Sequence, residues 1–193
     1  MSSTSDPGLR RAFAAALTLF GRHGFQRTSM ADIAREAGIA RATLYLRFPD
    51  KRALFEALAA SLVDEALARA EAAWLDDASL SENIAATLLA KDLGFFHMLH
   101  ATPHGAELLN LEAELTAAHV ARLDTGFAAL LAERGRQAAE AGADLTAFGG
   151  AAGFAAFLAT AGSSLKHEAR TEEAFRLVVH RLARVSACAA GRD

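Results

Sequence analysis

Apolar residues recur at intervals of three and four positions along almost the whole chain. This spacing places them on one face of an α-helix, whereas a half-buried strand alternates apolar and polar residues. The chain has no alternating β-branched run, only three prolines and abundant alanine. We therefore predict an all-α fold.

The first predicted helix covers residues 8–23 and ends at Gly24. Glycine commonly ends a helix because it adopts the left-handed backbone conformation at little cost. Phe25 follows and is expected to fill a small core. The apolar stripe that can pack over the next segment comprises Leu9, Phe13, Leu17 and Phe20.

A helix-turn-helix is predicted in the segment that follows, residues 28–51. The first helix begins at Thr28 and Ser29, and Ser29 has the capping-box spacing to Asp32. Gly38 ends this helix and permits a sharp turn, after which a second helix begins near Ala40. Helix pairs of this kind also occur in helical proteins that bind no DNA, so the motif alone leaves that alternative open.

The second helix has an apolar face and a polar face. Leu44 and Phe48 lie four residues apart and are predicted to enter the core, and Pro49 ends the helix. Arginine binds guanine edges or phosphates, alanine allows close approach to a groove, and Thr and Tyr hydroxyls reach phosphate oxygens. The residues left on the polar face are Arg41, Ala42, Thr43, Tyr45 and Arg47.

The fourth predicted helix runs from Asp50, which can cap it, to about Leu75. Lys51 and Arg52 occupy its first turn. Cations at this end oppose the helix dipole, which indicates an anionic partner. The helix is longer than a small core requires, so we interpret it as a connector between an N-terminal domain, 1–50, and a C-terminal domain, 51–193.

Several positions between residues 13 and 58 match the pattern of a known family: Phe20-Gly21, Gly24-Phe25, Thr28-Ser29, Asp32-Ile33-Ala34, Ala37-Gly38-Ile39, Thr43-Leu44-Tyr45, Phe48, Lys51 and Leu54-Phe55. Through these residues the segment resembles the TetR family of helix-turn-helix transcriptional regulators. The resemblance implies that the segment binds DNA through Thr28, Ser29, Arg41, Ala42, Thr43, Tyr45 and Arg47, with Lys51 on a phosphate. Two residues depart from the family pattern: Ala40 replaces a frequent capping Ser, and Arg47 a frequent His or Tyr. We therefore expect a weak cap and a sequence preference that cannot be transferred from relatives.

The middle of the chain is predicted to form two further helices. A break falls at residues 76–79, where Ser79 and Glu82 have capping-box spacing for a helix over 81–100. The next helix is expected to start at Thr102-Pro103 and to end, with one interruption, before Gly135.

Two apolar segments at the C-terminal end, 145–165 and 171–190, suggest a dimer interface. The first contains no charged residue, but its Ala, Gly, Thr and Ser give little drive to enter lipid, so we predict a helix buried in protein and no membrane span. Together the two helices exceed what one small body needs to cover itself, and a two-fold four-helix interface would use the surplus. The residues expected at this interface are Gly149, Gly153, Phe157, Phe175, Val178, Leu182 and Val185.

Charge and cysteine usage fit a DNA-binding protein of a reducing compartment. The net charge of −3 divides unevenly, since residues 1–52 contain nine Lys/Arg and four Asp/Glu while the remainder contains eleven and nineteen. The basic end is the expected electrostatic footprint on DNA. The single cysteine, Cys188, excludes an internal disulfide and suits the cytoplasm, and the polar start of the chain contains no signal peptide pattern.

The C-terminal domain contains candidates for two further kinds of site. His97, His100 and His104, followed by Glu107, have spacings that resemble metal ligands, but Pro103 interrupts their helix. An apolar effector pocket is the preferred prediction, and no cofactor or catalytic constellation is expected. The large side chains assigned to this pocket are Trp74, Phe95, Phe96, Met98, Leu99, His100, Phe127 and Phe148, with His97 and His119 as further polar anchors.

The sequence thus predicts a homodimeric transcriptional repressor that binds a palindromic double-stranded DNA operator. A small, largely apolar effector would shift the connector helix, change the separation of the two DNA-reading heads and release the operator. Two alternatives remain: a metal-responsive regulator that uses the three histidines, and an α-helical interaction module without DNA binding.

Overall fold

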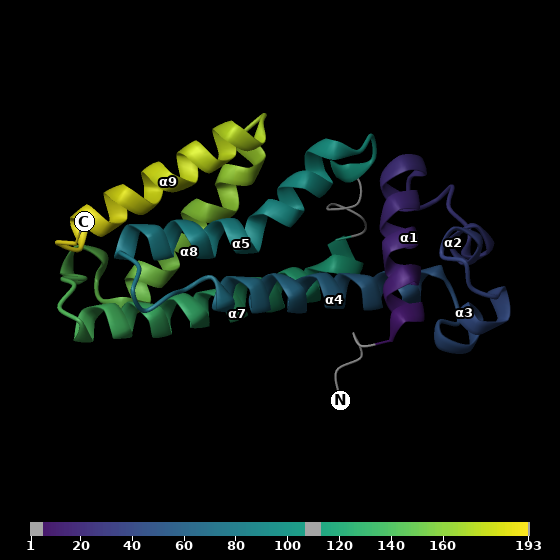
Figure 1. Cartoon of the computed structure of the whole chain (residues 1–193), viewed down its shortest axis with the longest axis horizontal. Coiled ribbons are helices and arrows are strands. Elements are labelled where there is room, and N and C mark those ends of the chain that lie inside the picture. The colour runs from purple at the N-terminus through teal and green to yellow at the C-terminus, as the bar shows by residue number, and fades with distance from the viewer. Residues whose placement is uncertain (1–5, 107–112, 193) are drawn as a thin grey trace. The chain divides into compact units, whose positions relative to one another are not determined.

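The structure, a computed structural model, describes residues 6–106 and 113–192, and these form α-helices and one short 3-10 helix without any strand (Figure 1). The all-α prediction is confirmed. The helices are α1 (Pro7–His23), α2 (Met30–Glu36), α3 (Arg41–Arg47), α4 (Lys51–Ala72), α5 (Leu80–Ala101), α7 (Ala113–Glu140), η2 (Thr146–Phe148), α8 (Ala151–Glu168) and α9 (Glu172–Ala189).

The chain divides into two compact units. Unit 1 comprises residues 1–63 and 98–119, and unit 2 comprises residues 64–97 and 120–193. Unit 1 therefore contains the predicted DNA-binding segment together with the first part of α4 and the end of α5. Each unit has its own hydrophobic core.

The core of unit 1 is built from α1, α2, α3 and the start of α4. Asp6 caps α1 by accepting a hydrogen bond from the backbone N–H of Gly8 at 2.7 Å. Three phenylalanine rings meet in its centre: Phe20 lies 5.2 Å from Phe25 and 5.9 Å from Phe55, centroid to centroid. The buried residues of α2 and α3 belong to the same core, which stabilises these two helices because they are too short to be stable alone.

The loop between α4 and α5 is fixed by predicted and unpredicted contacts. Ser79 and Glu82 form the predicted capping box, in which the Glu82 carboxylate accepts from the Ser79 backbone N–H at 2.9 Å and the Ser79 hydroxyl accepts from the Glu82 N–H at 3.3 Å. Asn83, which is buried, accepts from the Leu75 N–H and donates to the Leu75 carbonyl, both at 2.8 Å. The side-chain amide of Asn83 thus bonds both backbone polar groups of Leu75 and fixes the turn.

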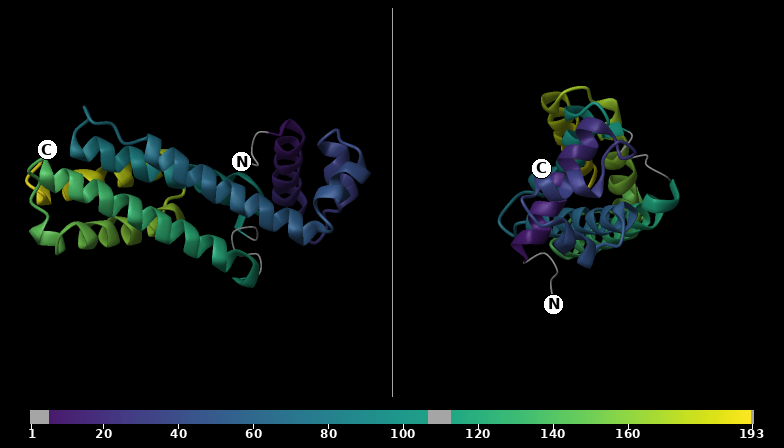
Figure 2. Two further views of the ribbon diagram at one scale, coloured as in Figure 1. Left: turned by 90° about the horizontal axis from the view of Figure 1, so that it is seen from below. Right: turned by 90° about the vertical axis from the view of Figure 1, so that its right-hand side faces the viewer.

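The core of unit 2 lies between α5, α7, α8, α9 and the second part of α4. Phe96 of α5 stacks on Phe175 of α9 with 4.9 Å between ring centroids. Helices α8 and α9 lie side by side and are joined by a short turn (Figures 1 and 2).

Two predicted helices differ from the structure. Helix α7 does not end before Gly135 but continues to Glu140, because Gly135 serves close packing: a Cβ there would lie 3.2 Å from the Phe154 ring. The predicted helix over 145–165 is broken at Gly149 and Gly150, which have φ angles of 78° and 90°. Non-glycine residues rarely adopt these angles, so the chain forms η2 first and α8 afterwards.

Helix α8 is not buried on all sides as predicted, since Ala152, Ala156, Phe157 and Thr160 are exposed on one face. Among the helices described here, none has the length and apolar character needed to cross a membrane.

Candidate nucleic-acid interface

Helix α2 begins as the sequence predicts, with Ser29 as its cap. The Ser29 hydroxyl accepts a hydrogen bond from the Asp32 N–H at 3.2 Å, and the Asp32 carboxylate accepts from the Ser29 N–H at 3.2 Å. The same carboxylate accepts from the Ser29 hydroxyl at 2.5 Å, and this bond is the largest reason that the pKa of Asp32 is lowered.

The turn between α2 and α3 depends on Gly38, whose φ angle is +63°. The N–H of Gly38 donates to the Arg35 carbonyl at 3.2 Å, and the N–H of Ile39 donates to the Ala34 carbonyl at 3.0 Å. These bonds satisfy carbonyls at the end of α2 and reverse the chain. Helix α3 then begins at Arg41, and Ala40 provides no side-chain cap, as predicted.

Helix α3 divides into a buried side and an exposed side. Leu44 is fully buried, and Phe48 packs on Phe13 with 6.0 Å between ring centroids. The residues of α3 that are predicted to face DNA are all exposed: Arg41, Ala42, Thr43, Tyr45 and Arg47. Sequence reasoning missed Leu46, which is 87% exposed on this helix. Its position between Tyr45 and Arg47 was the only available signal.

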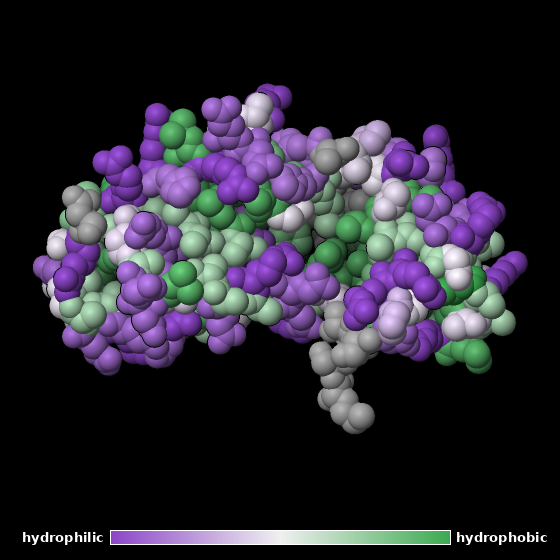
Figure 3. All heavy atoms as spheres, viewed as in Figure 1, coloured by the Kyte–Doolittle hydropathy of each residue, from purple (hydrophilic) through white to green (hydrophobic). Residues whose placement is uncertain are grey.

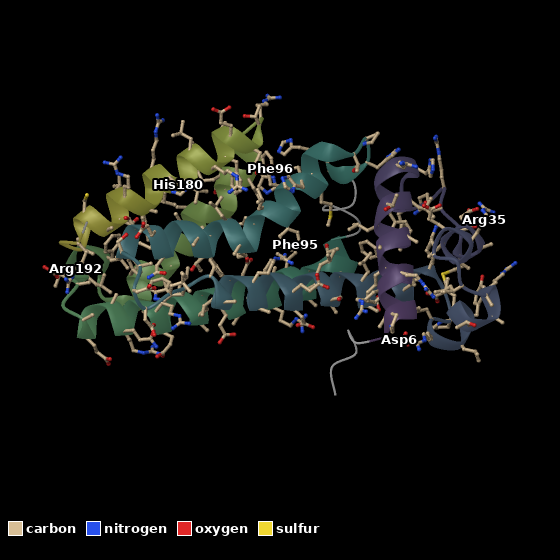
Figure 4. The ribbon with its side chains drawn as sticks, in the orientation of Figure 1. Asp6, Arg35, Phe95, Phe96, His180 and Arg192 are labelled. Carbon is tan, nitrogen blue, oxygen red and sulfur yellow. The ribbon has the colours of Figure 1, made fainter. Side chains whose placement is uncertain are left out.

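The two arginines of α3 are held differently. The Arg41 guanidinium donates to the Tyr45 hydroxyl at 3.5 Å and lies over the Tyr45 ring. Arg47 forms an ion pair with Asp6 at the start of α1, where Figure 4 marks Asp6. The pKa of Asp6 is lowered, first by its hydrogen bond from Gly8 and then by Arg47. Asp6 thus orients Arg47 while it caps α1.

Lys51, at the start of α4, lies against the turn that precedes α2. Its ammonium group donates to the carbonyls of Phe25, Thr28 and Gln26 at 2.6, 2.9 and 3.3 Å. It also lies 4.4 Å from the centre of the Phe25 ring. Desolvation lowers its pKa. Because an ammonium group has three N–H donors, this arrangement uses all of them, and the predicted phosphate contact stays a prediction.

Thr28 lies inside unit 1 and not on its surface. The residue is only 4% exposed, and its hydroxyl donates to the Gly24 carbonyl at 2.9 Å. The prediction of a DNA contact is therefore corrected for the Thr28 side chain, since its hydroxyl closes the turn after α1. Ser29 beside it is exposed.

The residues predicted to form an effector pocket do not converge on one cavity among the described residues. Trp74 lines a cavity of about 340 Å³ in unit 2, and the other seven predicted residues are absent from its lining. Phe96 and Phe127 are buried in the core of unit 2, whereas Met98 packs against the core of unit 1. Figure 4 shows Phe95 and Phe96 on different sides of α5. Leu99 is half-buried, His100 is exposed, and Phe148 packs on Phe154.

The predicted dimer residues are also divided by the structure. Phe157 and Val185 are 44% and 66% exposed, and Gly149 is exposed, while Gly153, Val178 and Leu182 are half-buried. Phe175 is wrongly placed in this set, because it is fully buried against Phe96. Leu177 of α9, which the sequence analysis did not assign, is exposed.

The predicted metal alternative finds no support in the described residues. No group of three or more His, Cys, Asp or Glu side chains there could hold a metal ion. The Nε2 atom of His97 instead lies 2.7 Å from the Glu172 carboxylate. Glu107 lies outside the described residues.

Residues 12–58 match the family described as "Bacterial regulatory proteins, tetR family". The HTH-type transcriptional repressor ComR of Escherichia coli (strain K12) is 32% identical over 95 residues, which are 49% of this chain and 45% of ComR. The chain thus matches less than half the length of this relative. The resemblance to TetR-type regulators is confirmed.

Solved structures with a similar fold cover nearly the whole chain. The fatty acid degradation regulator FadR from Bacillus halodurans matches with a TM-score of 0.70 and 18% identity, over 94% of this chain and 96% of FadR. The flavonoid-responsive regulator FrrA matches with a TM-score of 0.60 and 26% identity, over 94% of this chain and 96% of FrrA.

Proposed function

We propose that this chain, whose resemblance to the TetR family of transcriptional regulators is established above, is a homodimeric repressor that binds duplex DNA through α3 and releases it on binding a small molecule. The observation that carries the proposal is the outward face of α3. Leu44 is fully buried, whereas Arg41, Thr43, Tyr45 and Arg47, which all lie within three residues of it, are exposed. A short helix presented in this way has the dimensions and the donors to enter a major groove.

The proposed contacts fall into two classes. Arg41 and Arg47 can bind base edges or phosphates, and Ala42 allows α3 to approach the groove wall closely. Exposed Leu46 adds an apolar contact of the kind made with a thymine methyl group. The hydroxyls of Ser29, Thr43 and Tyr45 are assigned to phosphates, and so is Lys51 if its ammonium turns from the carbonyls that it contacts in this conformation.

Selection of bound sequences from a random duplex library tests the DNA-binding function. We expect a palindromic consensus with half-sites separated by about one helical turn, ~34–36 Å, or slightly more. Arg41→Ala should weaken binding to the selected duplex and relax preference at one position of each half-site, at a cost of about 1–3 kcal/mol. Arg69→Ala in unit 2, an exposed arginine outside α1–α3, serves as the matched control. Recovery of no enriched sequence would contradict the proposal.

The homodimer is proposed to form through the exposed faces of α8 and α9. Phe157, Leu177 and Val185 are large apolar side chains with 44%, 48% and 66% of their surface exposed. Figure 3 shows apolar residues between polar ones on the surface of unit 2. Two copies related by a two-fold axis would cover these residues, and a palindromic site requires two reading heads.

Sedimentation equilibrium tests the dimer. Phe157→Glu should shift the protein from dimer to monomer because it buries an unpaired charge in the interface. Val120→Glu changes a side chain of similar exposure on α7 and should leave the dimer intact. If the association constant of Phe157→Glu equals that of wild type, α8 does not belong to the dimer interface.

Release by a small molecule is proposed from two observations. FrrA is by its name flavonoid-responsive, and α4 continues without a break from unit 1 into unit 2. A ligand that binds unit 2 better in one conformation can shift the populations of both units through this helix, by no more than its difference in affinity. A regulator of this kind would act in the cytoplasm, where its operator lies.

A further inference from the structure

The interior of unit 2 contains a lysine with an incomplete set of partners. Lys91 of α5 is only 1% exposed, and its ammonium lies 3.0 Å from a carboxylate oxygen of Asp92, which is equally buried. The other oxygen of Asp92 accepts a hydrogen bond from Lys166 of α8 at 3.2 Å. Two ammonium groups therefore share the Asp92 carboxylate, and the negative charge of Asp124 on α7 also acts on Lys91.

Hydrogen bonds at this place are also incomplete. The hydroxyl of Thr87, one helical turn before Lys91, is fully buried and has no hydrogen-bond partner among the described residues. The Asp92 oxygen nearest Lys91 is at ion-pair distance but lacks a hydrogen bond of normal geometry. Buried polar atoms are nearly always hydrogen-bonded, so neighbouring deficits indicate a place where another group can bind.

The polar groups with incomplete hydrogen bonding lie on α5, which packs with α7 and reaches a cavity at its other end. Helices α5 and α7 run in opposite directions (Figure 1). Asn83 and Ala138 line the cavity of about 340 Å³, and Lys91 lies over the Phe127 ring at 4.6 Å. Thr87 therefore lies between the level of the cavity and the level of Lys91, about 6 Å from each along the helix axis.

The other walls of this region are apolar or aromatic. Leu88, Leu131 and Phe127 are fully buried, and Trp74 stands at the cavity with the Arg134 guanidinium over its ring. The Arg134 Nε atom is a further buried donor without a partner among the described residues. Such surroundings suit the carbon skeleton of a ligand, while Lys91 and Thr87 suit an anionic head.

A purely structural role explains Lys91 less well. Burial of an ammonium costs free energy that the shared Asp92 carboxylate and the charge of Asp124 offset only in part. An apolar residue of similar size would serve the packing better. Desolvation by burial accordingly lowers the pKa of Lys91. A buried charge whose surrounding polar groups are not all hydrogen-bonded is typical of a binding site.

We propose that Lys91 and Thr87 form the anion-binding end of the effector site, and that the effector is an organic acid with an apolar body. Its carboxylate would bind the Lys91 ammonium and accept a hydrogen bond from the Thr87 hydroxyl, while Asp92 keeps its pairing with Lys166. The apolar body would extend along Phe127 and Leu131 towards Trp74. This inference rests on the proposed ligand-responsive function and changes the predicted effector from largely apolar to amphipathic.

Matched acids and amides test the proposal by thermal unfolding and calorimetric titration of the full-length protein. The probes are straight-chain carboxylates from butanoate to decanoate and the ring-bearing benzoate, phenylacetate and phenylpropionate, each with its primary amide. We expect at least one acid to raise the melting temperature while its amide does not. Equal shifts by acid and amide, or no shift by any acid in the series, would overturn the proposal.

Variants assign the effect to the two residues. Lys91→Met should fold with an unchanged or higher melting temperature and should bind the active acid about 10- to 100-fold more weakly. Thr87→Val, which is nearly isosteric, should weaken it about 2- to 10-fold. Arg69→Met removes an exposed cation from the same unit and should retain full binding. Full acid binding by Lys91→Met would overturn the assignment.

Fluorescence anisotropy on the selected duplex separates this inference from the proposed function. If wild type binds the duplex and no acid in the series binds the protein, the inference fails while the regulator stands. If wild type binds no duplex but binds an acid through Lys91, the DNA-binding function fails and the ligand site stands.

Discussion

The outward face of unit 1 and the interior of unit 2 use polar residues in opposite ways. In unit 1 the groups that define the candidate interface come from one short stretch, residues 29–51. Many of their bonds are local, as in the Ser29–Asp32 capping box, although Arg47 also pairs with Asp6 across 41 residues. In unit 2 the notable polar groups are buried, and Asp92 is joined to Lys166 across 74 residues of sequence. The comparison indicates that a surface for a large partner can be built from local signals, whereas an interior site depends on tertiary contacts.

The largest expected effect is on the stability of unit 1, and two leucines of α3 test it. Leu44→Ala should lower the free energy of unfolding by about 2–5 kcal/mol, because it leaves a cavity in the core. Leu46→Ala, on the exposed side, should change it by no more than ~0.5 kcal/mol. Urea unfolding followed by circular dichroism measures both. Equal losses would show that α3 is not anchored through Leu44 alone.

Lys51 tests how far unit 1 depends on contacts between residues distant in sequence, because it connects α4 to the turn before α2. Lys51→Met removes three hydrogen bonds to carbonyls and should cost about 1–3 kcal/mol of unfolding free energy. If Lys51 acts only on the fold, the dependence of DNA affinity on salt stays unchanged in the variant. If it also binds phosphate, the slope of log affinity against log salt falls by about 1 per contact.

Asp6 tests whether a residue outside α3 fixes the orientation of a side chain on the proposed DNA-binding surface. Asp6→Asn keeps a side chain that can cap α1 but removes the ion pair with Arg47 and one negative charge beside the proposed DNA surface. We expect DNA affinity to rise up to about fivefold and preference at the Arg47 position to broaden. Asp32→Asn, which removes an acidic residue from α2 without touching Arg47, is the control. A selected consensus identical to that of wild type would show that Asp6 does not position Arg47.

The smallest expected effect is a pH dependence confined to the caps of unit 1. The pKa of Asp32 is lowered in the folded state by its hydrogen bonds from Ser29. Its contribution to stability is therefore present above the unfolded pKa of about 3.9 and is lost as the pH falls through the lower folded value. Acid titration of the Asp32→Asn variant should show a shallower loss of stability than wild type in this range. Identical acid profiles would indicate that the capping box does not contribute.

The sequence predicts the helix-turn-helix well because its determinants are local. A capping pair, a glycine with positive φ and a proline are each read from a few adjacent residues. The buried position of Thr28 and the carbonyl contacts of Lys51 depend on how the turn 24–28 folds back on α4, which spacing does not reveal.

Unit 2 could be predicted only in outline. The helical periodicity of α9 is correct, but two apolar faces exist on it, and periodicity alone could not tell that Phe175 faces the core and Leu177 faces solvent. The break at Gly149 and Gly150 was hidden because a continuous run without charge resembles one helix. Lys91 and Thr87 were not singled out, since a lysine in a helix is usually on the surface.

Trp74 and Tyr45 are the single tryptophan and single tyrosine of the chain. Trp74 lines the cavity of unit 2, and Tyr45 lies exposed on α3 of unit 1. The unlabelled protein therefore carries one intrinsic chromophore for each of its two proposed binding events. Emission from the indole can report occupancy of the interior, and quenching of the phenol can report contact with a nucleic acid, in one cuvette and without altering a residue.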